Sequence, residues 1–191
     1  MTPSTARRAL TGFAALTLGS VILAGCAGGF DSPAGVGDTA RTSLTAALPT
    51  DPSSMDPIRS GALVVLSVFF HTHDQLVKIA ADGTLEPKLA TEWTANDDLT
   101  QWEFTLTPGV TASNGEAIDA DDVVFTYETI LGDPSGENYA YLSSLDSVEA
   151  VDATTVRFTL KQPFSAFPRN TSLISIVPAD TYQDMGADAY A

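Results

Sequence analysis

The sequence predicts an α/β fold, in which short strands alternate with turns and a few helices. Two segments, 101–106 and 156–160, place apolar side chains at every second position. That two-residue period is typical of a strand with one buried and one exposed face. A third segment, 118–132, repeats its apolar side chains at helical spacing behind an acidic start. Strands and helices interspersed in this way place the chain in the α/β class.

The N-terminus has the pattern of a removable export signal. Two arginines supply a positive start, residues 9–24 are almost uncharged and mostly apolar, and small residues precede Cys26. The apolar run of about 16 residues is shorter than the roughly 20 that a membrane-spanning helix needs. We therefore predict a signal peptide over residues 1–25, with its export route left open.

Cys26 is the only cysteine, so it has no partner for an intrachain disulfide. The stretch Leu23-Ala24-Gly25-Cys26 resembles the bacterial lipobox. That resemblance implies that the Cys26 thiol takes a diacylglycerol and becomes the first residue of the mature protein. The alternative is a plain secretory signal with an incidental cysteine. Residues 26–41, rich in Gly, Ala, Ser and Asp, predict a flexible tether after the lipidated cysteine.

Composition agrees with one extracytoplasmic globular domain. The net charge is −15, which argues against a nucleic-acid partner and against electrostatic attachment to anionic lipid. Hydrophobic residues make up 44% of the chain, enough for a core. The about 150 residues beyond the tether amount to roughly one domain, which we place at 42–191.

The first half of this domain is expected to contain a strand, a helix and a hairpin. Residues 42–48 predict an entering strand, and the apolar stretch 62–79 predicts one long helix packed into the core. Asp82-Gly83 then marks a turn. Residues 91–95 are expected to pair with the strand at 101–106 through a short polar turn.

The helix at 118–132 carries its own start and stop signals. Asp119 can cap the first turn, Asp122 occupies the third position of a capping box, and Gly132 can close the C-terminus. The apolar side chains of one broad face are Val123, Val124, Tyr127, Ile130 and Leu131. We therefore assign the acidic trio of Asp119, Asp121 and Asp122 to capping and the helix dipole. A metal site is the alternative.

Three stretches in this order, 55–61, 81–131 and 148–182, resemble the N-terminal lobe of the family 5 solute-binding proteins. These are the extracytoplasmic receptors of peptide, nickel and related ABC importers. The resemblance covers 44–191 and is most specific over 83–124. That part holds the family's Gly-x-x-x-Pro-x-Leu-Ala-x-x-Trp run, a Phe-x-Leu strand, two glycine turns and an Ala-x-Asp-Val helix start.

The resemblance implies a type II periplasmic-binding-protein-like fold, whose ligand lies in a cleft between two lobes that close by hinge motion. Family members are more than twice as long, and their second lobe comes later. Residues 42–191 are therefore expected to be an incomplete N-terminal lobe of a two-lobed receptor, truncated before the second lobe. The chain also departs from the family's usual sequence at 73–75 and at 96–99. The turn at 96–99 lacks a glycine that is common in the family.

By the same resemblance, three parts of the chain face the cleft: the segment 58–63, an aromatic beyond the capped helix, and the loop at 169–170. The candidates for ligand contact are Arg59, Ser60, Gly61, Leu63, Tyr139, Tyr141 and Asn170. Backbone groups near Gly61 suit pairing with an extended peptide. Tyrosine offers apolar area and a hydroxyl, and Arg59 or Arg169 suits a carboxylate. The alternative for each is a surface or packing role.

The sequence does not predict an enzyme. His71 and His73 both fall in the predicted apolar helix, so they point about 200° apart and cannot share a metal ion. The sequence has no cysteine pair and no glycine-rich phosphate loop after a strand. We expect no catalytic residues, no cofactor and no metal.

The prediction is therefore a lipid-anchored substrate-binding protein on the extracytoplasmic face of the bacterial cell membrane. It captures a small solute, an oligopeptide in the first instance, and delivers it to ABC permease subunits. Its expected partners are that ligand, the permease and, through the anchor, the membrane, with no nucleic acid. Nickel chelate, heme, opine and sugar ligands stay open. The alternative function is a surface lipoprotein interaction module, or a non-functional remnant of such a receptor.

Overall fold

The structure is a computed structural model that describes residues 47–52 and 54–190. The predicted signal peptide, Cys26 and the tether lie outside these residues, as does most of the strand predicted at 42–48. Residues 47 and 48 are described and belong to no strand. In the described part, no helix combines the length and the apolar character needed to cross a bilayer.

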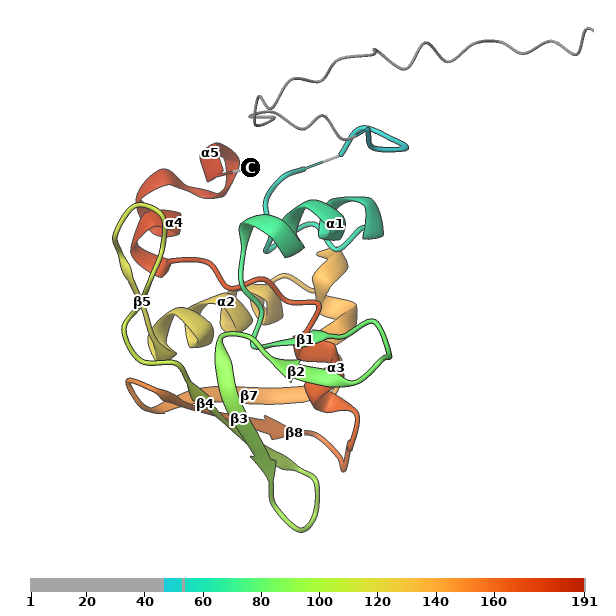
Figure 1. Cartoon of the computed structure of the whole chain (residues 1–191), viewed down its shortest axis with the longest axis vertical. Helices are drawn as coiled ribbons and strands as arrows, with labels where there is room; N and C mark the ends of the chain where they lie inside the picture. Colours follow the sequence, from blue (N-terminus) through green and yellow to red (C-terminus); the bar gives the residue numbers. More distant parts are fainter. Residues whose placement is uncertain (1–46, 53, 191) are drawn as a thin grey trace, which may run out of the picture. The chain divides into compact units, whose positions relative to one another are not determined.

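The largest sheet of the described fold has four strands, and every neighbouring pair of these strands is antiparallel (Figure 1). Its strands in spatial order are β3 (Ala90–Ala95), β4 (Gln101–Leu106), β8 (Thr155–Leu160) and β7 (Leu145–Asp152). The strands predicted from the two-residue period are confirmed. In β4 and β8 every second side chain is buried, as that period requires.

One face of the sheet is covered by α2 (Ala120–Gly132) (Figure 1). The two elements share an aromatic core. Phe158 of β8 lies at its centre. The Phe158 ring is 4.8 Å from the Tyr127 ring of α2 and 5.3 Å from the Phe104 ring of β4. Phe167 of α3 (Phe167–Thr171) completes the cluster at 5.3 Å from Phe158. All four side chains are fully buried, so this cluster makes a large contribution to the apolar area that folding removes from water.

The N-terminus of α2 has the predicted capping box. The Asp119 carboxylate accepts the N–H of Asp121 at 2.9 Å, and the Asp122 carboxylate accepts the N–H of Asp119 at 2.9 Å. Asp122 also accepts the N–H of Ala179 at 2.7 Å, which ties α2 to the start of α4 (Ala179–Met185). Burial raises the pKa of the Asp122 carboxyl, and these two N–H groups oppose the shift.

The bounds of α2 differ slightly from the predicted ones. Residues 117–118 form β6 (Ala117–Ile118), which pairs with β5 (Val110–Thr111), so the helix begins at Ala120. Gly132 is the last helical residue, but it does not adopt a left-handed cap. Asp133 follows with φ −119°, a conformation open to any residue. The predicted glycine cap is therefore wrong.

The long helix predicted at 62–79 is also wrong in its second half. The helix α1 runs over Leu63–Thr72, and His73 already has an extended backbone with φ −129° and ψ 154°. The chain then forms β1 (Val77–Ile79), which pairs with β2 (Leu85–Pro87) across the predicted turn at Asp82-Gly83. The periodicity of an apolar run does not distinguish a helix from a buried strand, and here pairing with the neighbouring strand β2 accompanies the change from helix to strand.

The packing of α1 also differs from the prediction. Its buried residues Val65, Leu66 and Phe69 form a small cluster of their own, separate from the core between α2 and the sheet. Two further short elements, η1 (Glu137–Leu142) and α5 (Ala187–Tyr190), complete the described chain.

The core predicts a large effect on stability for one aromatic substitution and a small effect for another. Phe158→Ala should lower the free energy of unfolding by about 3–5 kcal/mol, because it empties the centre of the cluster. Tyr127→Phe should change it by less than about 1 kcal/mol, since the buried Tyr127 hydroxyl has no hydrogen-bond partner among the described residues. Urea unfolding of both variants measures this. A large loss for Tyr127→Phe would mean that its hydroxyl has a partner.

Candidate functional site

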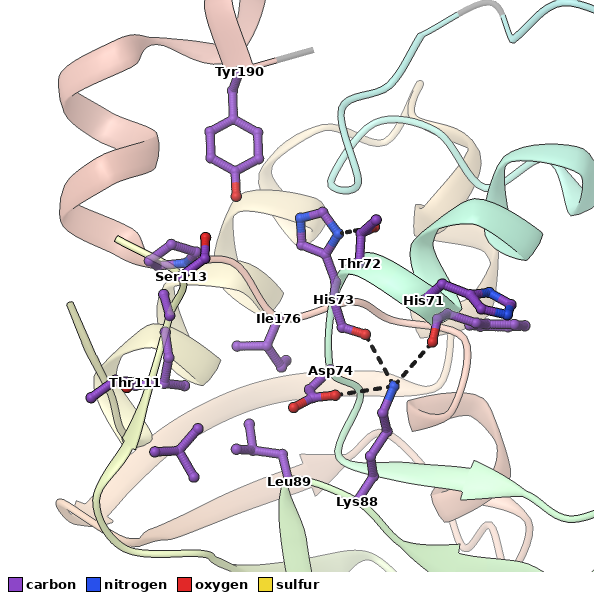
Figure 2. A pocket seen from close by; sticks show the side chains of 15 residues that line it. His71, Thr72, His73, Asp74, Lys88, Leu89, Thr111, Ser113, Ile176 and Tyr190 are labelled. Atoms are coloured by element: carbon purple, nitrogen blue, oxygen red, sulfur yellow. Dashed lines mark hydrogen bonds and ion pairs between the residues drawn. The ribbon is translucent and has the colours of Figure 1, made fainter. Parts of the chain in front are cut away.

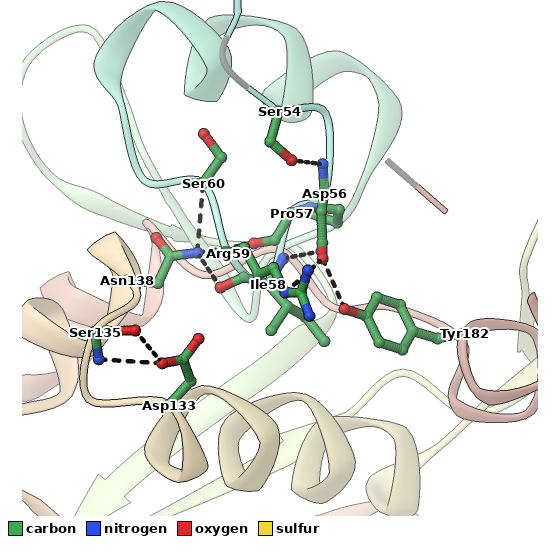
Figure 3. A network of polar contacts seen from close by, with 10 residues as sticks. All are labelled: Ser54, Asp56, Pro57, Ile58, Arg59, Ser60, Asp133, Ser135, Asn138 and Tyr182. Carbon is green, nitrogen blue, oxygen red and sulfur yellow. Dashed lines mark hydrogen bonds and ion pairs between the residues drawn. The ribbon is translucent and has the colours of Figure 1, made fainter. Parts of the chain in front are cut away.

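The segment 56–61 overlaps the stretch 58–63 that the family resemblance predicts to face the ligand. It is anchored by the buried carboxylate of Asp56 (Figure 3). Its Oδ1 accepts the N–H of Ile58 at 2.8 Å, a local turn that an aspartate before a proline favours. Its Oδ2 accepts the hydroxyl proton of Tyr182 in α4 at 2.8 Å, and the Arg59 Nε lies 3.7 Å from the same oxygen. The segment is thereby joined to a helix more than 120 residues further along the chain.

The Tyr182 hydroxyl is the donor in its hydrogen bond with Asp56. Burial raises the pKa of its hydroxyl, and the Asp56 carboxylate raises it further. The phenol therefore keeps its proton at any physiological pH and supplies it to Asp56.

The other side of the segment is held by η1. The Asn138 amide Nδ2 donates to the carbonyl oxygens of Pro57 at 2.8 Å and Ile58 at 3.0 Å (Figure 3). The N–H of Gly61 donates to Glu137 Oε2 at 2.9 Å, and the Tyr141 hydroxyl donates to the Gly61 carbonyl at 3.3 Å. Both backbone groups of Gly61 are thus engaged within the chain. A peptide that paired with them would have to displace these bonds.

Four of the predicted ligand residues are brought together in this way: Ser60, Gly61, Tyr141 and Asn170. The Asn170 amide joins the group by donating to the Tyr141 carbonyl at 2.8 Å. Ser60 and Gly61 are buried, whereas Tyr141 and Asn170 are partly exposed.

The other candidates differ from these four in the exposure or the contacts of their side chains. Arg59 has a half-exposed side chain and Tyr139 is partly buried. Leu63, at the first turn of α1, is 80% exposed. Arg169 donates instead to the Gly83 carbonyl at 2.7 Å, in the turn between β1 and β2.

Sequence reasoning did not single out the residues that hold this site. Asp56, Glu137, Asn138 and Tyr182 position the candidates, and only Asp56 had a usable signal, the Asp-Pro pair that favours a side-chain turn. The others act on segments about 80 or more residues away, and no local pattern reports such contacts.

A separate hollow of about 360 Å³ lies between the end of α1, β5 and Tyr190 of α5 (Figure 2). Lys88 lies at its side, and its Nζ donates to the His73 carbonyl at 3.0 Å and lies 3.1 Å from Asp74 Oδ1. Its charge is therefore matched within the chain. Of the described lining residues, none is among the predicted ligand contacts.

Both histidines are among the residues that line this hollow, and their rings point away from each other (Figure 2). The prediction that both lie in the helix is wrong, because α1 ends at Thr72 and His73 has an extended backbone. Burial lowers the pKa of the His73 imidazole, against an opposing effect of Asp74, and its Nδ1 lies 2.9 Å from the Thr72 hydroxyl. In the described ranges, no three His, Cys, Asp or Glu side chains come together as metal ligands would.

Comparison with known proteins identifies the family to which this fold belongs. Residues 84–190 match the family described as bacterial extracellular solute-binding proteins, family 5 middle. The chain belongs to this family. It is a family of binding proteins and not of enzymes, in agreement with the sequence-based expectation.

Individual relatives agree with this assignment. The chain is 32% identical over 122 residues to the probable D,D-dipeptide-binding periplasmic protein DdpA of Escherichia coli, covering 61% of this chain and 23% of that protein. It is 28% identical over 179 residues to the oligopeptide-binding protein OppA of Bacillus subtilis, covering 83% of this chain and 33% of that protein.

The solved structure of AgaA from A. tumefaciens R10, in complex with agropinic acid, has a similar fold. Its TM-score is 0.66 at 28% identity, over 74% of this chain and 29% of that one. The type II periplasmic-binding-protein-like fold predicted from the sequence is confirmed. The chain spans between 23% and 33% of the length of these three proteins.

Two glycines provide a matched test of how tightly the site is packed. A methyl group added at Gly61 would lie 2.6 Å from Asn138 Oδ1 and 3.2 Å from the Tyr141 ring, whereas one at Gly132 meets nothing within 4 Å. Gly61→Ala should therefore destabilise the chain by about 1–3 kcal/mol. Gly132→Ala should stabilise it by up to about 1 kcal/mol, since alanine favours a helix. Urea unfolding measures both, and equal stability of the two variants would contradict the described packing of Gly61 against η1.

Proposed function

We propose that this chain is part of an extracytoplasmic substrate-binding lipoprotein of an ABC importer, which captures a small solute and delivers it to the permease. The observation that carries the proposal is family membership over residues 84–190. An oligopeptide is the ligand class we favour, because two relatives are named for binding a dipeptide and oligopeptides. AgaA, in complex with agropinic acid, indicates that a similar fold also serves other small solutes.

The proposed site is the face made by residues 59–63 and η1, with Asn170 at its edge. Asp56 and Asn138 hold the backbone of this segment before any ligand arrives, which reduces the ordering cost of binding. Arg59, whose guanidinium is half exposed, is proposed to meet a ligand carboxylate. Tyr139 and Tyr141 supply ring area, and Ser60, Gly61 and Leu63 contribute the adjoining wall.

Because the chain spans a third or less of its relatives, the other wall of this cleft is proposed to come from polypeptide outside the chain. A ligand touching one wall keeps much of its surface in water, so little apolar area is buried. The membrane anchor is proposed to be a diacylglyceryl group on Cys26, with residues 1–25 removed and residues 26–41 as the tether. Such a two-chain anchor holds firmly, because each buried methylene contributes about 0.8 kcal/mol.

The anchor is tested by intact-mass spectrometry of the protein purified from the native membrane fraction. We expect a diacylglyceryl-modified chain that begins at Cys26 and has at least about twice the mass expected for this sequence alone, by analogy with its longer relatives. A chain that starts elsewhere without lipid would contradict the anchor. A species that ends at Ala191 would favour the interaction-module or remnant alternative over transport.

The ligand class is tested by calorimetric titration of the membrane-isolated protein with a mixture of tri- and tetrapeptides. Arg59→Gln should weaken binding by about 10- to 100-fold, because a charge-assisted hydrogen bond is lost. The matched control is Arg157→Gln in β8. Arg157 lies on the face of the sheet that α2 does not cover, 2.8 Å from Glu103 and from Glu149. The 191-residue chain alone should bind these peptides more weakly than micromolar. Micromolar binding by that chain, or an equal effect of the two substitutions, would contradict the proposed site.

A further inference from the structure

Glu137, the first residue of η1, is exposed, and its carboxylate is only partly used within the fold. Its Oε2 accepts the N–H of Gly61 at 2.9 Å, a bond that reaches back 76 residues along the chain. Among the ion pairs of the described residues, none includes Glu137. A carboxylate can accept about four hydrogen bonds, so this one keeps acceptor positions that are open to solvent.

A second oxygen and an aromatic ring approach the same glycine. The Oδ1 atom of the buried Asn138 amide would lie 2.6 Å from a methyl group at Gly61, and it has no hydrogen-bond partner among the described residues. The Tyr141 ring would lie 3.2 Å from that methyl group. Carboxylate and amide oxygens carry negative charge, and the face of an aromatic ring attracts cations. The surroundings of Gly61 therefore favour a positively charged group.

Arg59, the guanidinium of the proposed site, does not offset this negative charge (Figure 3). Its Nε lies 3.7 Å from the Oδ2 of Asp56. Hydrogen bonds from Ser135 lower the pKa of the Asp133 carboxyl, and the charge of Arg59 lowers it further. With Glu137, three carboxylates thus surround one guanidinium, and this part of the surface stays negative after Arg59 is counted.

We propose that Glu137 is a specificity-determining residue that binds an ammonium group of the ligand, with the Tyr141 ring beside it. An N–H of the ammonium donates to the acceptor positions that Gly61 leaves open, which makes a charge-assisted hydrogen bond. A peptide N-terminus and a lysine side chain both supply this group, and the net charge of −15 attracts either one. The inference rests on the proposed function and narrows its ligand class to peptides with a free amine.

The first experiment titrates the full chain, labelled with ¹⁵N, with n-butylammonium chloride. The amide resonance of Gly61, whose N–H is bonded to Glu137, should shift and saturate as this probe is added. The uncharged probe n-butanol should leave it unchanged, a comparison that needs no variant. Glu137→Gln keeps an acceptor for the Gly61 N–H and removes the charge, so it should abolish the shift. Absence of a saturable shift, or the same shift in the variant, would overturn the inference whether or not peptides bind.

The second experiment is calorimetric titration of the membrane-isolated protein with trialanine, N-acetyl-trialanine and N-acetyl-Ala-Ala-Lys. Acetylation removes the ammonium and should weaken trialanine binding by about 10- to 100-fold, because a charge-assisted hydrogen bond is lost. Glu137→Gln should weaken trialanine by a similar factor and leave the acetylated peptide unchanged, whereas a purely structural role would weaken both equally. Recovery of affinity with the lysine peptide would assign the site to a side-chain ammonium, and no recovery would assign it to the N-terminus.

The matched control is Glu92→Gln, at an exposed glutamate of β3, which should leave all three affinities unchanged. Equal binding of trialanine and its acetylated form would overturn the inference and leave the oligopeptide class intact. If no peptide binds and butylammonium still shifts Gly61, the oligopeptide class is contradicted and the ammonium site is supported.

Discussion

The buried carboxylate of Asp56 constrains the arrangement of both ends of the described chain. A buried carboxylate is costly unless hydrogen bonds replace the lost water, so its donors must be in place. One donor, the N–H of Ile58, is local, while the other, the Tyr182 hydroxyl, comes from α4. The start of α4 is in turn held by Asp122 of α2 and by Glu116, which accepts the N–H of Asp180 at 3.1 Å. The segment that leads into α1 is thus tied to the central core through carboxylates.

Two faces of the molecule differ in how firmly they are held. The segment 56–61 is bonded to α4 through the Asp56 side chain and to η1 through its backbone, so its shape is set before any partner arrives. That property suits a site for a small ligand, whose affinity depends on a low ordering cost. The C-terminal half of α1 instead borders two hollows, of about 360 Å³ and about 330 Å³, and Phe70 lines both.

These two faces also show why the candidate site was only partly predictable. The residues that resemblance assigned to ligand contact include Ser60, Gly61, Tyr141 and Asn170, and the fold does gather them. The resemblance did not identify the interactions that bring these residues together. Glu137 and Asn138 do this by bonds to backbone groups about 80 residues earlier, and such bonds leave no periodicity in either segment.

Where the deciding interactions are local, the sequence determined the structure. The strands β4 and β8 follow from a two-residue period, and the capping box of α2 follows from two aspartates three residues apart. The end of α1 was decided by tertiary structure. The carbonyl of Asp74 accepts the N–H of Ile176 at 2.8 Å, and that of Gln75 accepts the N–H of Leu89 at 3.1 Å. The apolar run at 62–79 predicts a helix throughout, but after Thr72 these distant donors and the pairing of β1 with β2 satisfy the backbone in an extended conformation.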